Sequence, residues 1–280
     1  MATELQPSEI HPTAIVAPGA VLGAGTIVGP YTIIGPHVRV GERCRIGPHV
    51  VLDGYTTLGA ENIIFQFASV GAPPQDLKYR GEPSTLVLGD RNIIREYVTL
   101  QPGTTNGGMA TTIGHGNLFM ANSHVGHDSH LGDGNVIANS AAIAGHVRIL
   151  DRVTIGGLCG IHQFVTVGDQ AIIGGGAMVS QDIPPYTMAQ GDRAKLIGLN
   201  KIGLERHGMA PEAISRLKRL YRDVFFGGAA LRDRTLRERA THLRGENTDF
   251  APGMVLLNFI LASQRGVAGP RRQSVGADDE

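Results

Sequence analysis

An apolar residue recurs at every sixth position over most of the chain, and this period restricts the possible folds more than any other feature. One run extends from Ile10 to Val70 and a second, unbroken, from Ile113 to Val179, with Leu88, Ile94 and Leu100 between them. Six residues advance an α-helix by about 1.67 turns, so residues at this spacing cannot share one helical face. The period therefore indicates short strands joined by corners.

The corners have their own composition. Glycine often follows the apolar residue, as at Gly23, Gly29 and Gly35, where we expect a tight corner that favours a residue without a Cβ. Three units of strand and corner would form one triangular coil of about 18 residues, with coils stacked roughly 4.8 Å apart and apolar side chains inside. The sequence therefore predicts an all-β solenoid, a parallel β-helix of hexapeptide repeats, followed by a small α-helical C-terminal domain.

Breaks in the period define the domain organisation. We expect the β-helix over residues 8–190, with loops at 72–87 and 101–112, where Pro, Gly and charged residues replace the repeat. A C-terminal helical domain is expected over 191–266, followed by a disordered tail at 267–280. Three helices are predicted within that domain, beginning near Pro211, Leu231 and Pro252 and ending near Gly227, Leu243 and Ala262.

Composition excludes several classes of function. The 25 basic and 25 acidic residues give zero net charge, which argues against a nucleic-acid-coating protein. No apolar run reaches the roughly 18 to 20 residues that span a bilayer. The two cysteines, Cys44 and Cys159, are too few for a disulfide scaffold, and no leader opens the chain, so we expect a cytoplasmic protein with both thiols as buried core residues.

Residues 18 apart should lie above one another on successive coils, which brings several histidines to one ridge. His127 then stacks with Gly145 and Gln163, Asp128 stacks with His146, and His162 occupies the neighbouring column. His124 should lie near the same corner. A neutral imidazole beside a carboxylate, as in His127 with Asp128, is the arrangement of a general base near neutral pH. The ridge is therefore the candidate catalytic site.

A metal site is the rival interpretation, because histidine is a common zinc ligand. His124 and His130 are one hexapeptide apart, so they should point along different faces, and no cysteine joins them. We therefore favour acid–base chemistry and expect neither metal nor cofactor. No nucleophile-elbow, P-loop or dinucleotide-binding motif is present.

Longer segments carry a family resemblance. The stretches HVGHDSHLG, NVIANSAAIAGHV, GGLCGIHQFVTVG and QDIPPYTMAQGDRA, together with QDLKYRGEPSTLVLGDRNIIREYVTL, resemble the UDP-N-acetylglucosamine O-acyltransferases, a family of hexapeptide-repeat transferases. The resemblance covers nearly the whole chain. It implies a left-handed β-helix and a homotrimer with sites between subunits. It also implies transfer of an (R)-3-hydroxyacyl group from acyl carrier protein to the 3-hydroxyl of UDP-N-acetylglucosamine, the first step of lipid A biosynthesis.

The resemblance also assigns roles to residues. It implies His127 as the base, Asp128 as the group that orients it, and the backbone N–H of Gly145 as the oxyanion donor. Gly175 falls where the family measures acyl-chain length, and its missing side chain suggests room for a longer chain. The substrate-contacting positions that it implies, on the sugar, acyl chain or phosphates, are Gln75, Asp76, Lys78, His124, His146, His162, Gln163, Asn200 and Arg206.

Two departures leave alternatives open. Gly126 stands where many relatives have alanine, and Ile202 where some have an acidic residue, so the acceptor could be the 3-amino analogue of the sugar nucleotide. The N-acyltransferase of the same pathway, a CoA-dependent acetyltransferase and a metal-binding hexapeptide protein are the remaining alternatives. Arg and Lys residues of the C-terminal domain are candidates for docking the acidic carrier protein.

Overall fold

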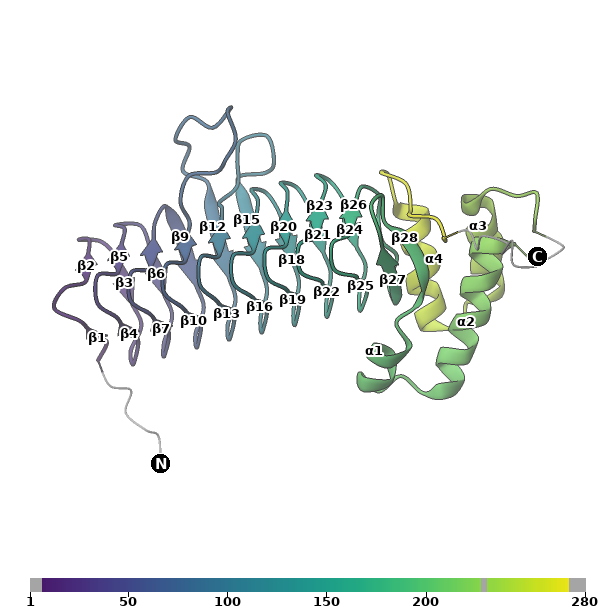
Figure 1. The fold of residues 1–280 in the computed structure, drawn as a ribbon, viewed down its shortest axis with the longest axis horizontal. Helices are drawn as coiled ribbons and strands as arrows, with labels where there is room; N and C mark the ends of the chain where they lie inside the picture. Colours follow the sequence, from purple (N-terminus) through teal and green to yellow (C-terminus); the bar gives the residue numbers. More distant parts are fainter. Residues whose placement is uncertain (1–6, 228–230, 272–280) are drawn as a thin grey trace, which may run out of the picture.

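The computed structural model describes residues 7–227 and 231–271, and its main body is a long prism of short parallel strands (Figure 1). Most strands contain only two residues, an outward one followed by a buried aliphatic, as in β17 (His124–Val125). Successive strands belong to three different sheets, and each pairs in parallel with a strand of the neighbouring coil. The predicted left-handed parallel β-helix with a helical C-terminal part is confirmed.

The three faces of the prism are three sheets. Sheet A contains β1 (Glu9–Ile10), β4 (Ile27–Val28), β7 (Arg45–Ile46), β10 (Ile63–Ile64), β13 (Ile93–Ile94), β16 (Leu118–Phe119), β19 (Val136–Ile137), β22 (Thr154–Ile155), β25 (Ile172–Ile173), β27 (Thr187–Gln190) and β28 (Lys195–Leu199). Sheet B contains β2 (Ile15–Val16), β5 (Ile33–Ile34), β8 (Val51–Leu52), β11 (Ser69–Val70), β14 (Thr99–Leu100), β17, β20 (Ala142–Ile143), β23 (Gly160–Ile161) and β26 (Met178–Val179). Sheet C contains β3 (Val21–Leu22), β6 (Arg39–Val40), β9 (Tyr55–Leu58), β12 (Thr85–Leu88), β15 (Ala110–Ile113), β18 (His130–Leu131), β21 (Arg148–Ile149) and β24 (Thr166–Val167).

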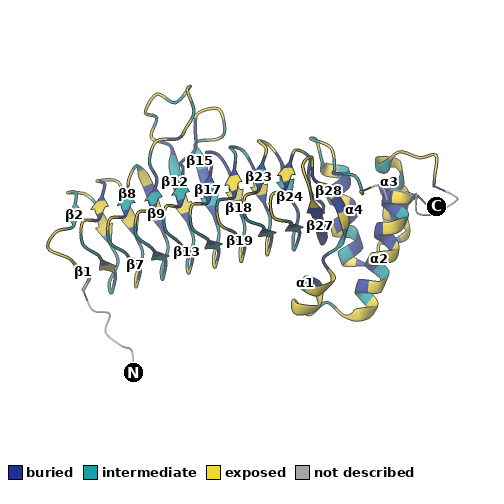
Figure 2. Ribbon diagram, in the orientation of Figure 1, coloured by how far each residue is buried: buried dark blue, intermediate teal, exposed yellow. Residues whose placement is uncertain are grey.

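The register confirms that residues 18 apart stack. Val125 pairs with Ile143, and Ile143 pairs with Ile161, and all three side chains are at most 2% exposed. Their columns fill the prism, whose strands alternate between buried and exposed residues (Figure 2). One inner corner is polar instead, with a buried ladder in which Asn92 Oδ1 accepts from the backbone N–H and the side-chain amide of Asn117.

The corners differ from the expectation in detail. The left-handed conformation falls three residues after the buried aliphatic, as at Asp128 (φ 59°), His146 (φ 61°) and Phe164 (φ 66°). The glycines that directly follow the aliphatic residue, as at Gly23, Gly29, Gly35 and Gly41, do not carry a positive φ, and Gly71 (φ 85°), where the first loop leaves the prism, is an exception. Glycine is required there by close approach between coils, because a Cβ on Gly41 would lie 2.5 Å from the carbonyl carbon of Gly59 in the next coil.

The two loops leave the prism at the corner between sheets B and C. β12 and β15 begin at Thr85 and Ala110, so residues 85–87 and 110–112 belong to four-residue strands rather than to the predicted loops. The remaining loop segments touch each other, because Thr105 Oγ1 donates to Glu82 Oε1 at 2.9 Å. Figure 1 shows them projecting together from one edge of the solenoid.

The C-terminal part contains more structure than expected. β27 and β28 form an antiparallel hairpin on sheet A. The described residues after it contain four helices: α1 (Lys201–Arg206), α2 (Pro211–Phe226), α3 (Leu236–Glu246) and α4 (Ala251–Ala262). The hairpin and α1 were not predicted. α3 begins five residues later than expected, because a capping box between Thr235 and Glu238 fixes its start.

The segment after α4 also differs from the expected loose tail. Val267 pairs with Asp182 and Pro270 pairs with Leu196, so residues 267–271 are fixed on the last coil and the hairpin. The rest of the predicted disordered tail, 272–280, lies outside the described residues. Among the described helices, none combines the length and the hydropathy that crossing a bilayer requires.

Candidate active site

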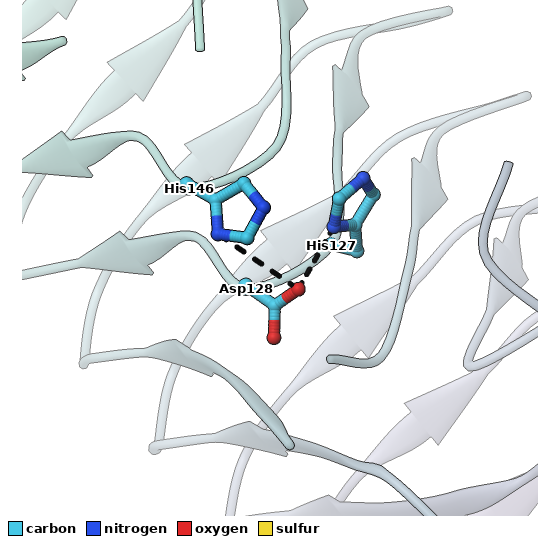
Figure 3. A group of neighbouring side chains, drawn as sticks. All are labelled: His127, Asp128 and His146. Atoms are coloured by element: carbon cyan, nitrogen blue, oxygen red, sulfur yellow. Dashed lines mark hydrogen bonds and ion pairs between the residues drawn. The ribbon is translucent and has the colours of Figure 1, made fainter. Parts of the chain in front are cut away.

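His127 and Asp128 form a buried pair at the corner between β17 and β18. His127 Nδ1 lies 2.8 Å from Asp128 Oδ2, and the two residues are 8% and 2% exposed. Figure 3 shows both side chains converging with His146. The left-handed backbone at Asp128 turns its carboxylate back toward the preceding ring. A carboxylate on Nδ1 fixes the imidazole in the tautomer that leaves Nε2 as the basic nitrogen.

The second loop holds the Asp128 carboxylate. Asp128 Oδ1 accepts from the backbone N–H of Thr104 at 2.8 Å, and Oδ2 accepts from the Thr104 hydroxyl at 2.6 Å. A Cβ on Gly107 would collide with the same carboxylate. The stacking rule could not find Thr104, because its loop lies outside the repeat. Its two hydrogen bonds hold the buried carboxylate in place.

Gly145 lies directly beside the His127 ring, as the stacking rule predicts. A Cβ at this position would lie 2.6 Å from Cε1 and 2.7 Å from Nε2. The neighbouring amides are engaged, since Ala144 N–H donates to Ile161 O and His146 N–H to His127 O. No acceptor for the Gly145 N–H is found among the described residues. A backbone donor is thus available beside the basic nitrogen of His127.

His146 packs beside the pair from the next coil. Its ring makes an edge contact with His127, with centroids 5.0 Å apart, and stacks on Phe164 at 4.6 Å. Its Nδ1 is 4.0 Å from Asp128 Oδ2. Burial lowers the pKa of His146, although the Asp128 carboxylate opposes this shift. Because the His146 ring is neutral, it does not compete with His127 for the Asp128 carboxylate.

His124 is the outward residue of β17, three residues before His127. Its Nδ1 is 2.7 Å from Thr99 Oγ1 on the preceding coil. Burial lowers its pKa, and the charge of His127 acts in the same direction. His124 is therefore a neutral polar group beside the base.

A groove of about 560 Å³ runs along sheet B from this corner. Its floor is low because Ala142 and Gly160 are the outward residues of β20 and β23, while Met178 forms its far wall. Many of the predicted site residues line this groove: Gln75, His124, His127, Gly145, His162 and Gln163. Gln101 and Arg193 also line it and were not predicted.

Other predicted residues lie apart from the groove. Asp76 and Lys78 belong to the first loop, where Asp76 Oδ1 accepts from the Lys78 N–H. Asn200 caps α1 by accepting from Gly203 N and donates to Gln170 O, while Arg206 is exposed at the end of that helix.

Gly175 also lies outside the groove. It is exposed and stacks on Gly157, whose carbonyl oxygen would be 3.5 Å from an added Cβ. A single chain therefore does not bring Gly175, Asn200 or Arg206 to His127.

One cluster has the composition of a metal site. Atoms of His127, Asp128 and His146 lie within 4.8 Å of one another, which differs from the histidine set weighed from the sequence. The Asp128 oxygens already accept from Thr104 and face His127 Nδ1, so the donors needed by a structural carboxylate are present without a cation. The arrangement fits a histidine–carboxylate base.

Family models match two parts of the chain. Residues 182–268 match the second domain of UDP-N-acetylglucosamine O-acyltransferase, and residues 19–54 match the bacterial transferase hexapeptide (six repeats).

Whole-chain relatives extend this match. The acyl-[acyl-carrier-protein]–UDP-N-acetylglucosamine O-acyltransferase of Myxococcus xanthus is 53% identical, over 93% of this chain and 99% of the relative. The enzyme of the same name from Burkholderia orbicola is 45% identical, also over 93% of this chain and 99% of the relative.

Solved structures agree with this assignment. The UDP-N-acetylglucosamine O-acyltransferase of Moraxella catarrhalis superposes with a TM-score of 0.87 at 40% identity, covering 92% of this chain and 99% of that one. The Arabidopsis UDP-N-acetylglucosamine acyltransferase gives a TM-score of 0.81 at 34% identity, with the same coverage. The sequence identity, the shared solenoid and the C-terminal match together show that the chain belongs to the UDP-N-acetylglucosamine O-acyltransferase family.

Proposed function

We propose that this acyltransferase moves an (R)-3-hydroxyacyl group from acyl carrier protein to the 3-hydroxyl of UDP-N-acetylglucosamine, the first step of lipid A biosynthesis. The observation that supports the chemistry is the position of the His127 ring, which lies between the Asp128 carboxylate and the backbone of Gly145. The substrate classes are those in the names of relatives that match over 93% of this chain.

The reaction follows from this geometry. Nε2 of His127 accepts the proton of the sugar hydroxyl as its oxygen attacks the thioester carbonyl. The carbonyl oxygen becomes an oxyanion, and the Gly145 N–H donates to it. Collapse of the intermediate breaks the carbon–sulfur bond, and the imidazolium returns the proton to the departing thiolate. Asp128 stabilises the transient imidazolium through Nδ1–H.

The groove on sheet B is the place for both substrates. Its small floor residues Ala142 and Gly160 leave room for an acyl chain, while His162 and Gln163 offer polar contacts. Gln75 lines the groove and its backbone N–H donates to Gln101 Oε1, so the first loop approaches the same corner. We assign Gln75, Asp76 and Lys78 to the sugar nucleotide.

We further propose that the functional unit is a homotrimer. Asn200, Arg206 and Gly175 lie away from the groove of their own chain, so their proposed contacts with nucleotide and acyl chain need a neighbouring subunit. Sheet A and its corner offer a surface for such contact, since Ile27, Ile93 and Phe67 are all at least 37% exposed. Exposed apolar residues in one stripe are typical of subunit interfaces.

The 3-amino acceptor has less structural support. A Cβ on Gly126 would lie 2.8 Å from the carbonyl carbon of Ala144, so packing between coils accounts for this glycine without a changed substrate. Ile202 is 65% exposed on α1, outside the groove. Both cysteines are buried and free, which agrees with a reducing cytoplasm as the place of reaction.

Mass spectrometry of products tests the proposal. Purified protein would be incubated with a panel of 3-hydroxyacyl carrier proteins and either UDP-N-acetylglucosamine or its 3-amino analogue. We expect acylation of the hydroxyl acceptor, at a rate unchanged by a chelator. If only the amino analogue is acylated, the acceptor is the 3-amino sugar nucleotide and not the hydroxyl form. If the rate depends on metal, the His127–Asp128–His146 cluster is favoured as a cation site. If neither acceptor is acylated, the proposed function is wrong.

A further inference from the structure

The segment that follows α4 binds to the last coil of the solenoid through hydrogen bonds to one buried residue, Asp182. Asp182 is 3% exposed. Its Oδ2 accepts from the Ser263 hydroxyl at 2.6 Å, and its Oδ1 accepts from Thr166 N–H at 2.8 Å. Its backbone N–H donates to Gly266 O, and its carbonyl accepts from Ala268 N–H. Residues 263–268 are therefore held firmly beside the candidate active site.

Arg265 projects from this fastened segment into that site. Its Nε donates to Ser180 O at 2.8 Å, and its Nη2 lies 2.8 Å from Nδ1 of His162, 103 positions earlier in the chain. The guanidinium is thus held at two points, one on the last coil and one on a histidine that lines the groove. The same arginine lines a second pocket of about 690 Å³ with His146 and Phe164. Arg265 therefore lies between this pocket and the groove on sheet B that His162 lines.

The contact determines which nitrogen of His162 carries a proton. A guanidinium only donates hydrogen bonds and stays protonated in proteins, so Nδ1 must be the acceptor. The Gln163 carbonyl also lies 3.2 Å from the same nitrogen, but it would need Nδ1 to donate. The shorter contact with Arg265 excludes that tautomer. A neutral His162 then carries its proton on Nε2, the nitrogen left for a ligand in the groove.

We propose that Arg265 is a positioning residue that holds His162 as the Nε2–H tautomer, so that this histidine acts as a hydrogen-bond donor to substrate. The consequence for catalysis rests on the proposed function, whereas the tautomer itself does not. The Nε2 atoms of His127 and His162 therefore have opposite hydrogen-bonding roles, because a different residue contacts Nδ1 of each ring. Asp128 on Nδ1 makes Nε2 of His127 an acceptor, and Arg265 on Nδ1 makes Nε2 of His162 a donor.

Arg265→Met removes the donor while keeping much of the aliphatic stem. Arg265→Lys keeps a donor-only group, and Arg39→Met is the control, because Arg39 is the exposed outward residue of β6 on an N-terminal coil, away from the site. Selective ¹⁵N-histidine labelling reports which ring nitrogen is protonated, with His162→Asn assigning the signal. We expect Nε2–H in the wild type, the Lys variant and the control, and a mixture of tautomers in the Met variant.

Kinetics tests the catalytic consequence separately. Loss of one oriented donor should lower kcat/KM of Arg265→Met by about fivefold to tenfold, with near wild-type values for the control. The same substitution should have no further effect in a His162→Ala background. An unchanged His162 tautomer in Arg265→Met, or an equal loss of activity in both backgrounds, would overturn the proposal. The labelling result stands even if the acceptor sugar differs from the one proposed.

Discussion

The ring of His127 lies against the backbone of Gly145, so closely that a Cβ at residue 145 would be 2.6 Å from the ring carbon Cε1. On its other side, the ring bonds Asp128 at 2.8 Å. The imidazole is thus confined between two successive coils of a rigid solenoid. The same closeness puts the Gly145 N–H next to the atom that would take a proton.

Gly145→Ala should disable the enzyme without unfolding it. The added methyl group would displace the His127 ring or separate the two coils locally, and both misplace the base and the oxyanion donor. We expect a loss of about 10²-fold or more in kcat. Gly157→Ala is the matched control, since a Cβ there meets only a carbonyl oxygen at 3.2 Å. Equal activity of the Gly145 variant and the wild type would refute the proposed geometry.

Thr104→Val should weaken catalysis through Asp128. The substitution removes the hydroxyl donor to Oδ2 but keeps the backbone N–H that donates to Oδ1, and the side chains are similar in size. We expect kcat to fall about tenfold, because a charge-assisted hydrogen bond contributes about 1.5 kcal/mol or more. Thr105→Val, which removes only the exposed contact with Glu82, should have little effect on kcat.

Two partly buried histidines with lowered pKa values predict a decline of stability in acid. Burial lowers the pKa of both His124 and His146, so the unfolded chain binds more protons than the folded one as pH falls below about 6.5. The stabilisation is complete above that pH and is lost as pH falls through the folded pKa values.

Urea denaturation between pH 7 and pH 5 measures this effect. We expect the unfolding midpoint to fall with pH and the slope to be smaller in His124→Gln. His11→Gln, at an exposed position near the N-terminus, serves as the control. A slope unaffected by the His124 substitution would mean that other groups cause the acid sensitivity.

The asparagine ladder should be important for stability. Asn92 donates to Asn62 Oδ1 and to the carbonyls of Gly89 and Gly114, and it accepts from Asn117. Asn92→Ala leaves several buried polar groups unpaired, which should lower the free energy of unfolding by about 3 kcal/mol. Thr105→Ala, which removes one exposed bond to Glu82, should change it by less than about 0.5 kcal/mol.

Gly175→Met tests the proposed measure of acyl-chain length. The backbone at Gly175 has no positive φ, and its Cβ direction is open beyond a contact of 3.5 Å, so methionine should be accommodated without strain. We expect the preferred acyl donor to become shorter in a panel of carrier-bound chains. A methionine at Gly176 would be strained, because this glycine is in the left-handed conformation at φ 70°. Leu158→Met, at an exposed position near Gly175, is therefore the control and should leave the chain preference unchanged. An unchanged chain preference would refute the role.

The repeat makes the fold and the catalytic column predictable because the geometry of a solenoid is nearly one-dimensional. A coil of fixed length converts sequence separation into spatial contact, so residue numbers alone place Gly145 over His127 and His146 beside Asp128. The same rule cannot reach groups outside the repeat. Thr104 approaches Asp128 from a loop whose path depends on tertiary contacts, and no periodic pattern encodes that path.

The C-terminal part is harder to predict for a similar reason. The β27–β28 hairpin follows a change from period six to ordinary strand alternation, within a stretch that contains prolines and glycines. Arg265 reaches His162 across 103 residues, a contact that follows only from docking of the last segment on Asp182. The repeat pattern predicts the base and its support within the solenoid, but not the residues that reach the site from outside it.

The single-turnover rate of His127→Asn most directly tests the central claim that His127 is the general base. Asparagine keeps polarity and approximate size but cannot accept the proton. We predict a rate of acyl transfer lower by about 10²- to 10⁴-fold, with the affinity for UDP-N-acetylglucosamine changed little. A rate within about threefold of wild type would contradict the account, because the proton of the acceptor would then have to pass to another group.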